Sequence, residues 1–180
     1  MPKPASKLDA ERLWDYALRS LGGRAYSTGE LRQKLRVKCE RAEDVDATIS
    51  RLKDFGYLDD KRFAEHFASA RLENQKLGKM RVLRDLQRRR VAPALAGRTV
   101  EKTYLGVDET RLIEDFIRRK LRKSNKFKEN KDFASAYGKL LRAGFQSGAV
   151  IKALKKFAKN PELLDDLEPP ENFLDEESTA

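Results

Sequence analysis

An internal repeat of about 50 residues is the feature that most constrains how this chain can fold. The segments Glu11–Leu18, Lys61–Ala68 and Thr110–Ile117 share one pattern. Each has an arginine, two apolar residues, an acid, a variable residue and two more apolar residues. Apolar spacing alone recurs in any amphipathic helix, whereas matching charges at two positions in three copies indicate a true repeat. We therefore expect three similar units in tandem.

Each unit contains three predicted helices. In the first unit, Gly22-Gly23 ends the first helix, while Ser27 and Glu30 form the capping box of the second. The apolar face of the third helix is marked by Val45, Ile49, Leu52 and Phe55. The later units repeat this succession, and no segment has the sustained alternation of a strand. The predicted fold is all-α, with three tandem three-helix bundles in an elongated, curved array, because about 50 residues bury too small a core to stand alone.

The predicted repeats cover residues 8–57, 58–107 and 108–160, after a disordered N-terminus at residues 1–7. Residues 161–180 carry eight acids and no base, and they follow a body with a net charge of +18. Pro161 and Pro169-Pro170 prevent this segment from extending the last helix. We expect a mobile acidic tail that competes with anionic ligands for the basic body.

The composition argues against catalysis. Cys39 and His66 are the only residues of their types, which excludes an internal disulfide and a Cys/His zinc site. His66 is predicted to be a partly exposed helix residue, and Trp14 a core residue. The sequence has no phosphate-binding glycine loop or nucleophile motif, so no catalytic residue, metal or cofactor is expected. Without a membrane helix or a signal peptide, we expect a soluble, cytoplasmic binding protein.

Three stretches of the sequence resemble the RecX family of RecA regulators. They are AYSTGELRQKL at Ala25–Leu35, RLKDFGYLDDKRFAEHFASAR at Arg51–Arg71 and LGKMRVLRDLQ at Leu77–Gln87. The residues of the three stretches match the family, and so do the order and the spacing of the stretches. The chain departs from the family after the second helix of units one and two, where the family usually has a glycine. Lys38-Cys39 and Arg90-Val91 stand there, while Gly144 keeps the glycine in unit three.

The resemblance implies the same three-repeat fold and a binding activity without catalysis. Members of this family lodge in the groove of RecA filaments on DNA, span neighbouring protomers and restrain filament extension, ATP hydrolysis and strand exchange. The implied partners are the RecA filament and single-stranded DNA or the RecA–DNA complex, with no membrane. The chain is expected to act as a monomer in homologous recombination and DNA repair.

Two arginine stripes are the candidate contact sites. The first lies on the second helix of unit two and consists of Arg81, Arg84 and Arg88. The second lies on the first helix of unit three and consists of Arg111, Arg118 and Arg122. Each stripe stands opposite the apolar face of its helix, and guanidinium groups pair bidentately with carboxylates and phosphates. The alternative is a solvated face with intramolecular pairs, such as Arg111 with Asp115.

The loop after the second stripe is a possible nucleic-acid contact. Its candidate residues are Lys126, Phe127, Lys128 and Lys131. A basic loop with an aromatic ring can hold a single strand by phosphate contact and stacking, but one ring is fewer than stacking platforms usually offer. Plain solvation is therefore the favoured interpretation of this loop.

A helix-turn-helix DNA-binding protein is the alternative function, since each unit could present its third helix to a major groove. The charged residues of the first two third helices include Lys53, Asp54, Arg98, Glu101 and Lys102. Their signs are mixed and they contain no compact set of arginine, asparagine and glutamine for reading bases. The sequence therefore favours a filament regulator.

Overall fold

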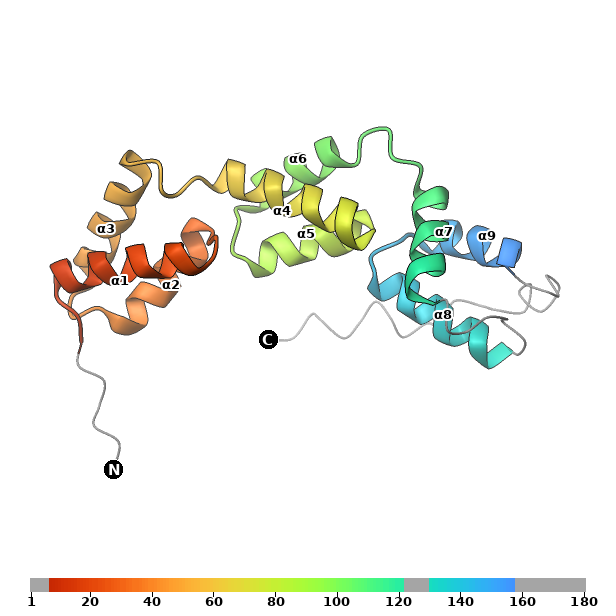
Figure 1. Ribbon diagram of the computed structural model, residues 1–180, viewed down its shortest axis with the longest axis horizontal. Coiled ribbons are helices and arrows are strands. Elements are labelled where there is room, and N and C mark those ends of the chain that lie inside the picture. Colours follow the sequence, from red (N-terminus) through yellow and green to blue (C-terminus); the bar gives the residue numbers. More distant parts are fainter. Residues whose placement is uncertain (1–6, 122–129, 158–180) are drawn as a thin grey trace, which may run out of the picture. The chain divides into compact units, whose positions relative to one another are not determined.

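The chain is α-helical throughout the part that the structure describes. This computed structural model describes residues 7–121 and 130–157, with the backbone alone at residues 130 and 131. Nine helices lie in these two ranges (Figure 1): α1 Ala10–Gly23, α2 Thr28–Lys38, α3 Ala42–Asp54, α4 Asp60–Gln75, α5 Lys79–Arg88, α6 Pro93–Thr103, α7 Glu109–Lys120, α8 Asn130–Arg142 and α9 Ser147–Phe157. The all-α fold of three successive three-helix groups is confirmed. The predicted acidic tail and most of the predicted N-terminus lie outside the described residues.

The chain divides into two compact units. Unit 1 consists of the chain up to Arg71 together with Val82–Leu105, and unit 2 of Leu72–Arg81 together with the chain from Gly106 onward. Helices α4 and α5 therefore contribute residues to both units. The repeat boundaries at residues 57 and 107 stay a prediction. None of the described helices combines the length and the apolar character that crossing a membrane would need.

The repeat extends upstream of the arginine that identifies it in the sequence. At the start of each group's first helix, an aspartate carboxylate accepts a hydrogen bond from the backbone N–H of that arginine. The pairs are Asp9 with Arg12 at 2.9 Å, Asp59 with Arg62 at 2.9 Å and Asp108 with Arg111 at 3.2 Å. Each aspartate satisfies one of the free N–H groups of a helix start. This bond lowers the pKa of Asp59 because it favours the charged carboxylate.

The acid of the repeated pattern connects the first helix of a group to the third. Glu65 of α4 pairs with Lys102 of α6 at 3.5 Å, and Glu114 of α7 pairs with Lys156 of α9 at 2.8 Å. Surface pairs of this kind stabilise a fold little. Their recurrence in two groups shows that the third helix keeps one register on the first.

The buried side chains differ in size between the first two groups. The first group buries Leu13, Ala17, Leu31, Leu35, Val45, Ile49 and Leu52. The second group buries Ala64, Ala68, Val82, Leu86, Ala96 and Val100. Smaller buried side chains remove less apolar area from water, so the second group depends more on the contacts that it makes with its neighbours.

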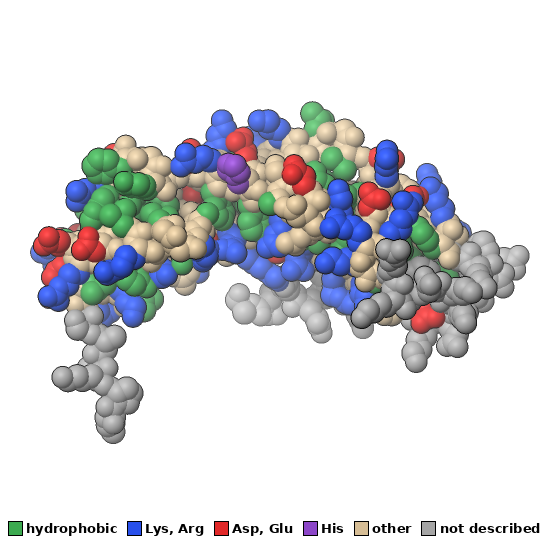
Figure 2. Space-filling view, in the orientation of Figure 1, with side chains coloured by type: hydrophobic (Ala, Val, Ile, Leu, Met, Phe, Trp, Pro, Cys, Tyr) green, Lys and Arg blue, Asp and Glu red, His purple; other side chains and the backbone are tan. Residues whose placement is uncertain are grey.

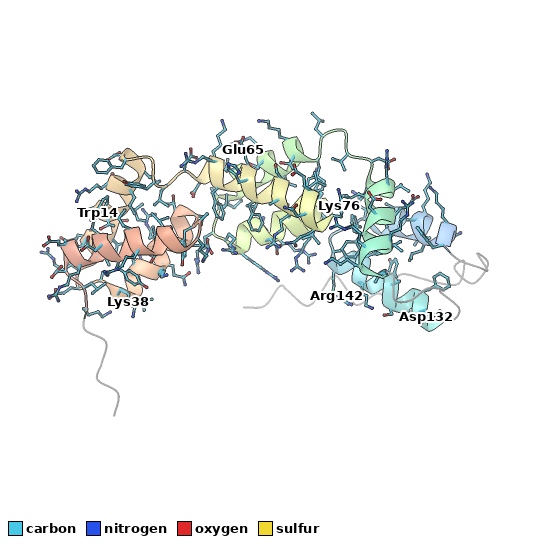
Figure 3. The ribbon with its side chains drawn as sticks, in the orientation of Figure 1. Trp14, Lys38, Glu65, Lys76, Asp132 and Arg142 are labelled. Carbon is cyan, nitrogen blue, oxygen red and sulfur yellow. The ribbon has the colours of Figure 1, made fainter. Side chains whose placement is uncertain are left out.

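Two aromatic residues of the first group differ from their predicted places. Trp14 is half-buried and packs against the core from between α1 and α3 (Figure 3), so its predicted core position is only partly correct. The prediction that Phe55 belongs to the apolar face of the third helix is wrong, because this residue is 61% exposed. Phe55 follows the last residue of α3 as its C-cap, where the chain turns away from the core.

Within unit 1, the start of α2 contacts the turn between α5 and α6. We call this contact the first junction. The Ser27 hydroxyl donates to the carbonyl of Arg89, and the Arg89 guanidinium donates to the Glu30 carboxylate at 3.0 Å. Beside them, a Cβ on Gly29 would lie 2.6 Å from the carbonyl oxygen of Arg90, so no larger residue fits there. The predicted capping box is present, and both of its side chains also join the two helix groups.

Within unit 2, the start of α5 contacts the turn between α8 and α9. We call this contact the second junction. The N–H of Gly78 donates to the carbonyl of Ala143 at 2.8 Å, and the N–H of Met80 donates to the carbonyl of Gly144 at 3.2 Å. A Cβ on Gly78 would lie within 3.0 Å of the Gly144 carbonyl, and a Cβ on Gly144 within 3.0 Å of the Arg81 backbone. Two glycines therefore let two backbones meet directly.

The turn after the second helix keeps one path in the second and third groups despite the missing glycine. Gly144 has a φ of 90°, and Arg90 adopts the same left-handed region with a φ of 56°. In both turns the next residue donates its N–H to the carbonyl of a buried leucine, as Val91 does to Leu86 at 3.1 Å. An arginine in this conformation is strained, since its Cβ crowds the backbone.

The corresponding turn of the first group takes a different path. Cys39 has an extended conformation, with a φ of −69° and a ψ of 149°. Leu8 pairs with this turn, donating its N–H to the Lys38 carbonyl at 2.8 Å and accepting from the Glu40 N–H at 2.9 Å. The departure from the family glycine at Lys38-Cys39 thus coincides with a turn that bonds to the chain's own N-terminal segment.

Candidate functional site

The first arginine stripe lies on α5, opposite an apolar face that points inward as predicted. Val82 and Leu86 are fully buried. Arg88 is exposed, whereas Arg81 and Arg84 are half-buried. The guanidinium of Arg81 donates to the carbonyl of Arg142 at 3.3 Å within unit 2. Arg88 is therefore the most exposed member of this stripe.

The second stripe lies on α7, where two of its members are described. Arg111 and Arg118 are both exposed, opposite the buried face of the helix. Arg118 pairs with Glu114 at 3.2 Å and with Asp115 at 3.7 Å. Among the described side chains, this arrangement takes the place of the expected pair between Arg111 and Asp115. The charge of Arg118 is partly compensated, so Arg111 is the stronger candidate.

The remaining predicted residues cannot be placed. Arg122 and the loop residues Lys126, Phe127 and Lys128 lie outside the described residues, as does the side chain of Lys131. Their roles stay predictions.

The last turn of α7 carries a cation that the helical-wheel analysis missed. Arg119 and Lys120 follow Arg118, and all three are exposed. Cations at a helix C-terminus are favoured by the helix dipole, so this turn concentrates positive charge. Arg119 was missed because its wheel position lies outside the stripe, although the run of three basic residues is visible in the sequence.

Unit 1 also contains a groove that the sequence did not reveal. Its volume is about 720 Å³, and apolar residues from the end of α1 and aromatic residues from the start of α4 line it. Figure 2 shows hydrophobic atoms gathered over the first group, with Lys and Arg side chains beside them. His66 lines this groove and is exposed, consistent with its predicted place on a helix surface.

The fold defines the class: an all-α protein built from tandem three-helix repeats. Among the described residues, no group of three or more His, Cys, Asp and Glu side chains is arranged to hold a metal ion. The family model for the first three-helix domain of RecX matches residues 14–52, and the model for the second three-helix domain matches residues 59–99.

Relatives among the RecX regulatory proteins match most of the chain. The protein of Deinococcus radiodurans is 31% identical over 151 residues, which cover 83% of this chain and 70% of the relative. The protein of Trichlorobacter lovleyi is 29% identical over 141 residues, covering 78% and 92% of the two chains. The protein of Photobacterium profundum is 43% identical over 70 residues, but these are only 26% of its length. The chain belongs to the RecX family of regulatory proteins.

A solved structure supports the fold independently. The crystal structure of RecX from Lactobacillus salivarius has a TM-score of 0.64 at 14% sequence identity, covering 82% of this chain and 96% of that one. At this low identity the likeness shows the three-helix-repeat fold alone.

Proposed function

We propose that this chain is a non-enzymatic regulator that binds the groove of RecA nucleoprotein filaments. It restrains filament extension, ATP hydrolysis and strand exchange, and it acts in the cytoplasm as a monomer. The observation that carries the proposal is the exposure of arginines on α5 and α7 in a chain of the RecX regulatory family. Such side chains suit an acidic protein groove or a phosphate track.

The mechanism is stabilisation of one filament conformation. A ligand that contacts neighbouring RecA protomers together favours the spacing that is complementary to it. Any step that changes this spacing must first break those contacts. Binding therefore slows both extension and the conformational cycle that accompanies ATP hydrolysis, without chemistry by the regulator.

Co-sedimentation with RecA filaments on single-stranded DNA tests the binding surface. The double variant Arg88→Glu and Arg111→Glu reverses one exposed charge of each stripe. We expect it to bind filaments about tenfold more weakly, because like charges placed against an acidic partner are repelled. Arg98→Glu makes the same charge change at an exposed position of α6 and is the matched control. Equal binding by the double variant and the control would remove the stripes from the interface.

ATP hydrolysis by RecA tests the regulatory activity. The chain by itself should hydrolyse no nucleotide, and it should lower DNA-dependent ATP hydrolysis at substoichiometric amounts. Unchanged RecA turnover at equimolar protein would contradict the proposed function.

The helix-turn-helix alternative receives no support from α6, the third helix of the second group. On α6, Lys102 pairs with Glu65, and the neighbouring Arg98 and Glu101 are exposed side chains of opposite sign. A helix with this surface is poorly suited to reading base edges. We therefore do not propose sequence-specific duplex binding.

A further inference from the structure

Three aromatic rings form a row at the surface of unit 1. The ring centroids of Trp14 and Phe55 are 6.0 Å apart, and those of Phe55 and Tyr57 are 6.3 Å apart. Phe55 is 61% exposed and Tyr57 is 55% exposed. We call this row the aromatic platform. Large exposed rings in a row are unusual on a surface that has no partner.

The platform continues into the groove of about 720 Å³, because Tyr57 also lines that groove. Further along the groove lie Phe63 and Phe67, whose rings are stacked with centroids 6.0 Å apart. Tyr57, Phe63 and Phe67 therefore all offer ring surface to a ligand in this groove.

Arginines accompany these rings. The Arg51 guanidinium lies 4.0 Å from the centroid of the Trp14 ring and 5.7 Å from that of Phe55. Arg62 lines the groove and donates to the Gly56 carbonyl at 2.9 Å. The groove also contains the Asp59 carboxylate, but this group accepts the N–H of Arg62 as the cap of α4. Cations at the platform are thus placed to meet a negatively charged ligand.

We propose that the aromatic platform binds unpaired bases of single-stranded nucleic acid, with Arg51 and Arg62 contacting the phosphates. Exposed rings accompanied by arginine are the recurring chemistry of single-strand binding, because every base has a flat π-face that stacks on a ring. A hydrophobic protein segment could also cover exposed rings, but it would gain little from the flanking guanidinium groups. The proposal adds to the proposed function a specific site on unit 1 for single-stranded nucleic acid, and this binding can be measured without RecA.

Trp14 provides a direct measurement, because it is the only tryptophan of the chain. Stacking of bases on Phe55 would bring them next to Trp14 and quench its fluorescence. We expect quenching on titration of the full chain with oligothymidylate. An abasic strand of the same length keeps the phosphates but removes the bases, so it should bind about tenfold more weakly.

Two substitutions test the platform itself. Phe55→Ala and Tyr57→Ala remove exposed rings, so the helical circular dichroism should remain native. Each should weaken the affinity for oligothymidylate, measured by fluorescence anisotropy of a labelled strand, by about tenfold. Tyr57→Phe keeps the ring and should bind like the natural chain. Val37→Ala is the matched control, because it removes a 67% exposed apolar side chain elsewhere in unit 1.

Two results would overturn the proposal. One is equal affinity for the thymidylate and abasic strands, a comparison that uses the natural chain and does not depend on how a variant folds. The other is alanine variants that bind single strands like Val37→Ala. If those variants instead lose filament binding while single-strand affinity is unchanged, the platform is a protein-docking surface and not a base-stacking one. RecA turnover is measured separately, so this proposal can fail without the proposed function failing.

Discussion

In the first junction a serine hydroxyl and a carboxylate from the start of α2 meet the α5–α6 turn, whereas in the second junction the backbone at the start of α5 meets the α8–α9 turn directly. The accepting carbonyls occupy equivalent positions. Arg89 stands three residues after the buried Leu86, and Ala143 stands three residues after the buried Leu140. The carbonyl at this position therefore accepts from a side-chain hydroxyl in the first junction and from a backbone N–H in the second.

The difference shows what a glycine decides in this fold. Gly144 has no Cβ, so the start of α5 approaches close enough for two backbone hydrogen bonds. At the equivalent turn, Arg90 carries a Cβ that packs against Gly29, and the hydrogen bonds across this contact come from the side chains of Ser27 and Arg89. We expect both junctions to be intolerant of substitution at their close-approach glycines, whereas only the side-chain junction should be sensitive to salt.

The largest effect is expected at the second junction. Gly144→Ala forces a Cβ onto the Arg81 backbone and places a non-glycine residue at a φ of 90°. It should lower the free energy of unfolding by about 3 kcal/mol. Urea denaturation followed by circular dichroism measures this. Gly148→Ala is the control, because its Cβ would meet nothing within 4 Å. If both variants have the same midpoint, the two backbones are not in close contact.

A smaller loss of stability is expected when the ion pair of the first junction is removed. Arg89→Ala removes the 3.0 Å contact with Glu30 and should lower the free energy of unfolding by about 1.5 kcal/mol at low salt. Added salt should reduce this difference, because it screens partly exposed ion pairs. Met80→Ala, which keeps the backbone bonds of the second junction, should show no such salt dependence. A loss from Arg89→Ala that is constant from low to high salt would contradict an ionic junction.

A stabilising change should convert the first junction toward the second. Arg90→Gly relieves the left-handed conformation of an arginine and should raise the free energy of unfolding by about 1 kcal/mol. Arg98→Gly removes the same side chain from within α6, where glycine should cost about 1 kcal/mol. Opposite shifts of the two unfolding midpoints are the expected result, and a destabilised Arg90→Gly variant would speak against the strained turn.

The smallest effect concerns pH, at the start of α4 in unit 1. The N–H of Arg62 lowers the pKa of Asp59 in the folded chain below its unfolded value of about 3.9. The contribution of Asp59 to stability is therefore present above that value and is lost as the pH falls through the folded pKa. Asp59→Asn keeps an oxygen acceptor but cannot titrate. Urea midpoints at pH 5 and pH 3 should differ less for this variant than for the natural chain, and an equal difference would contradict the prediction.

The sequence predicts local features of this fold well because those features depend on neighbouring residues. Helical periodicity located the three-helix groups, and the spacing of Ser27 and Glu30 predicted their capping box. Phe55 was misplaced because the same periodicity was continued one residue beyond the end of α3. The end of a helix depends on where the chain must turn. The spacing of apolar residues does not indicate that position.

The sites were harder to predict because they depend on residues far apart in the chain. The wheel placed the α5 arginines opposite the apolar face, but it could not show that the Arg81 side chain bonds to the carbonyl of Arg142. The aromatic platform joins Trp14 of α1 to Phe55 at the C-cap of α3, a contact that no local pattern encodes. The Ser27 bond to Arg89 spans 62 residues in the same way.

The bonds of Leu8 have a consequence for self-association. Lys38 stands three residues after the buried Leu35, so its carbonyl is the counterpart of those of Arg89 and Ala143. The carbonyl of Lys38 already accepts a hydrogen bond from the N–H of Leu8, and the N–H of Glu40 already donates to the carbonyl of Leu8. A second molecule offering the start of a helix to this turn would have to displace both bonds. Head-to-tail contacts that do not close on themselves produce open-ended fibres. We therefore expect the bonds of Leu8 to disfavour head-to-tail association of two chains through this turn.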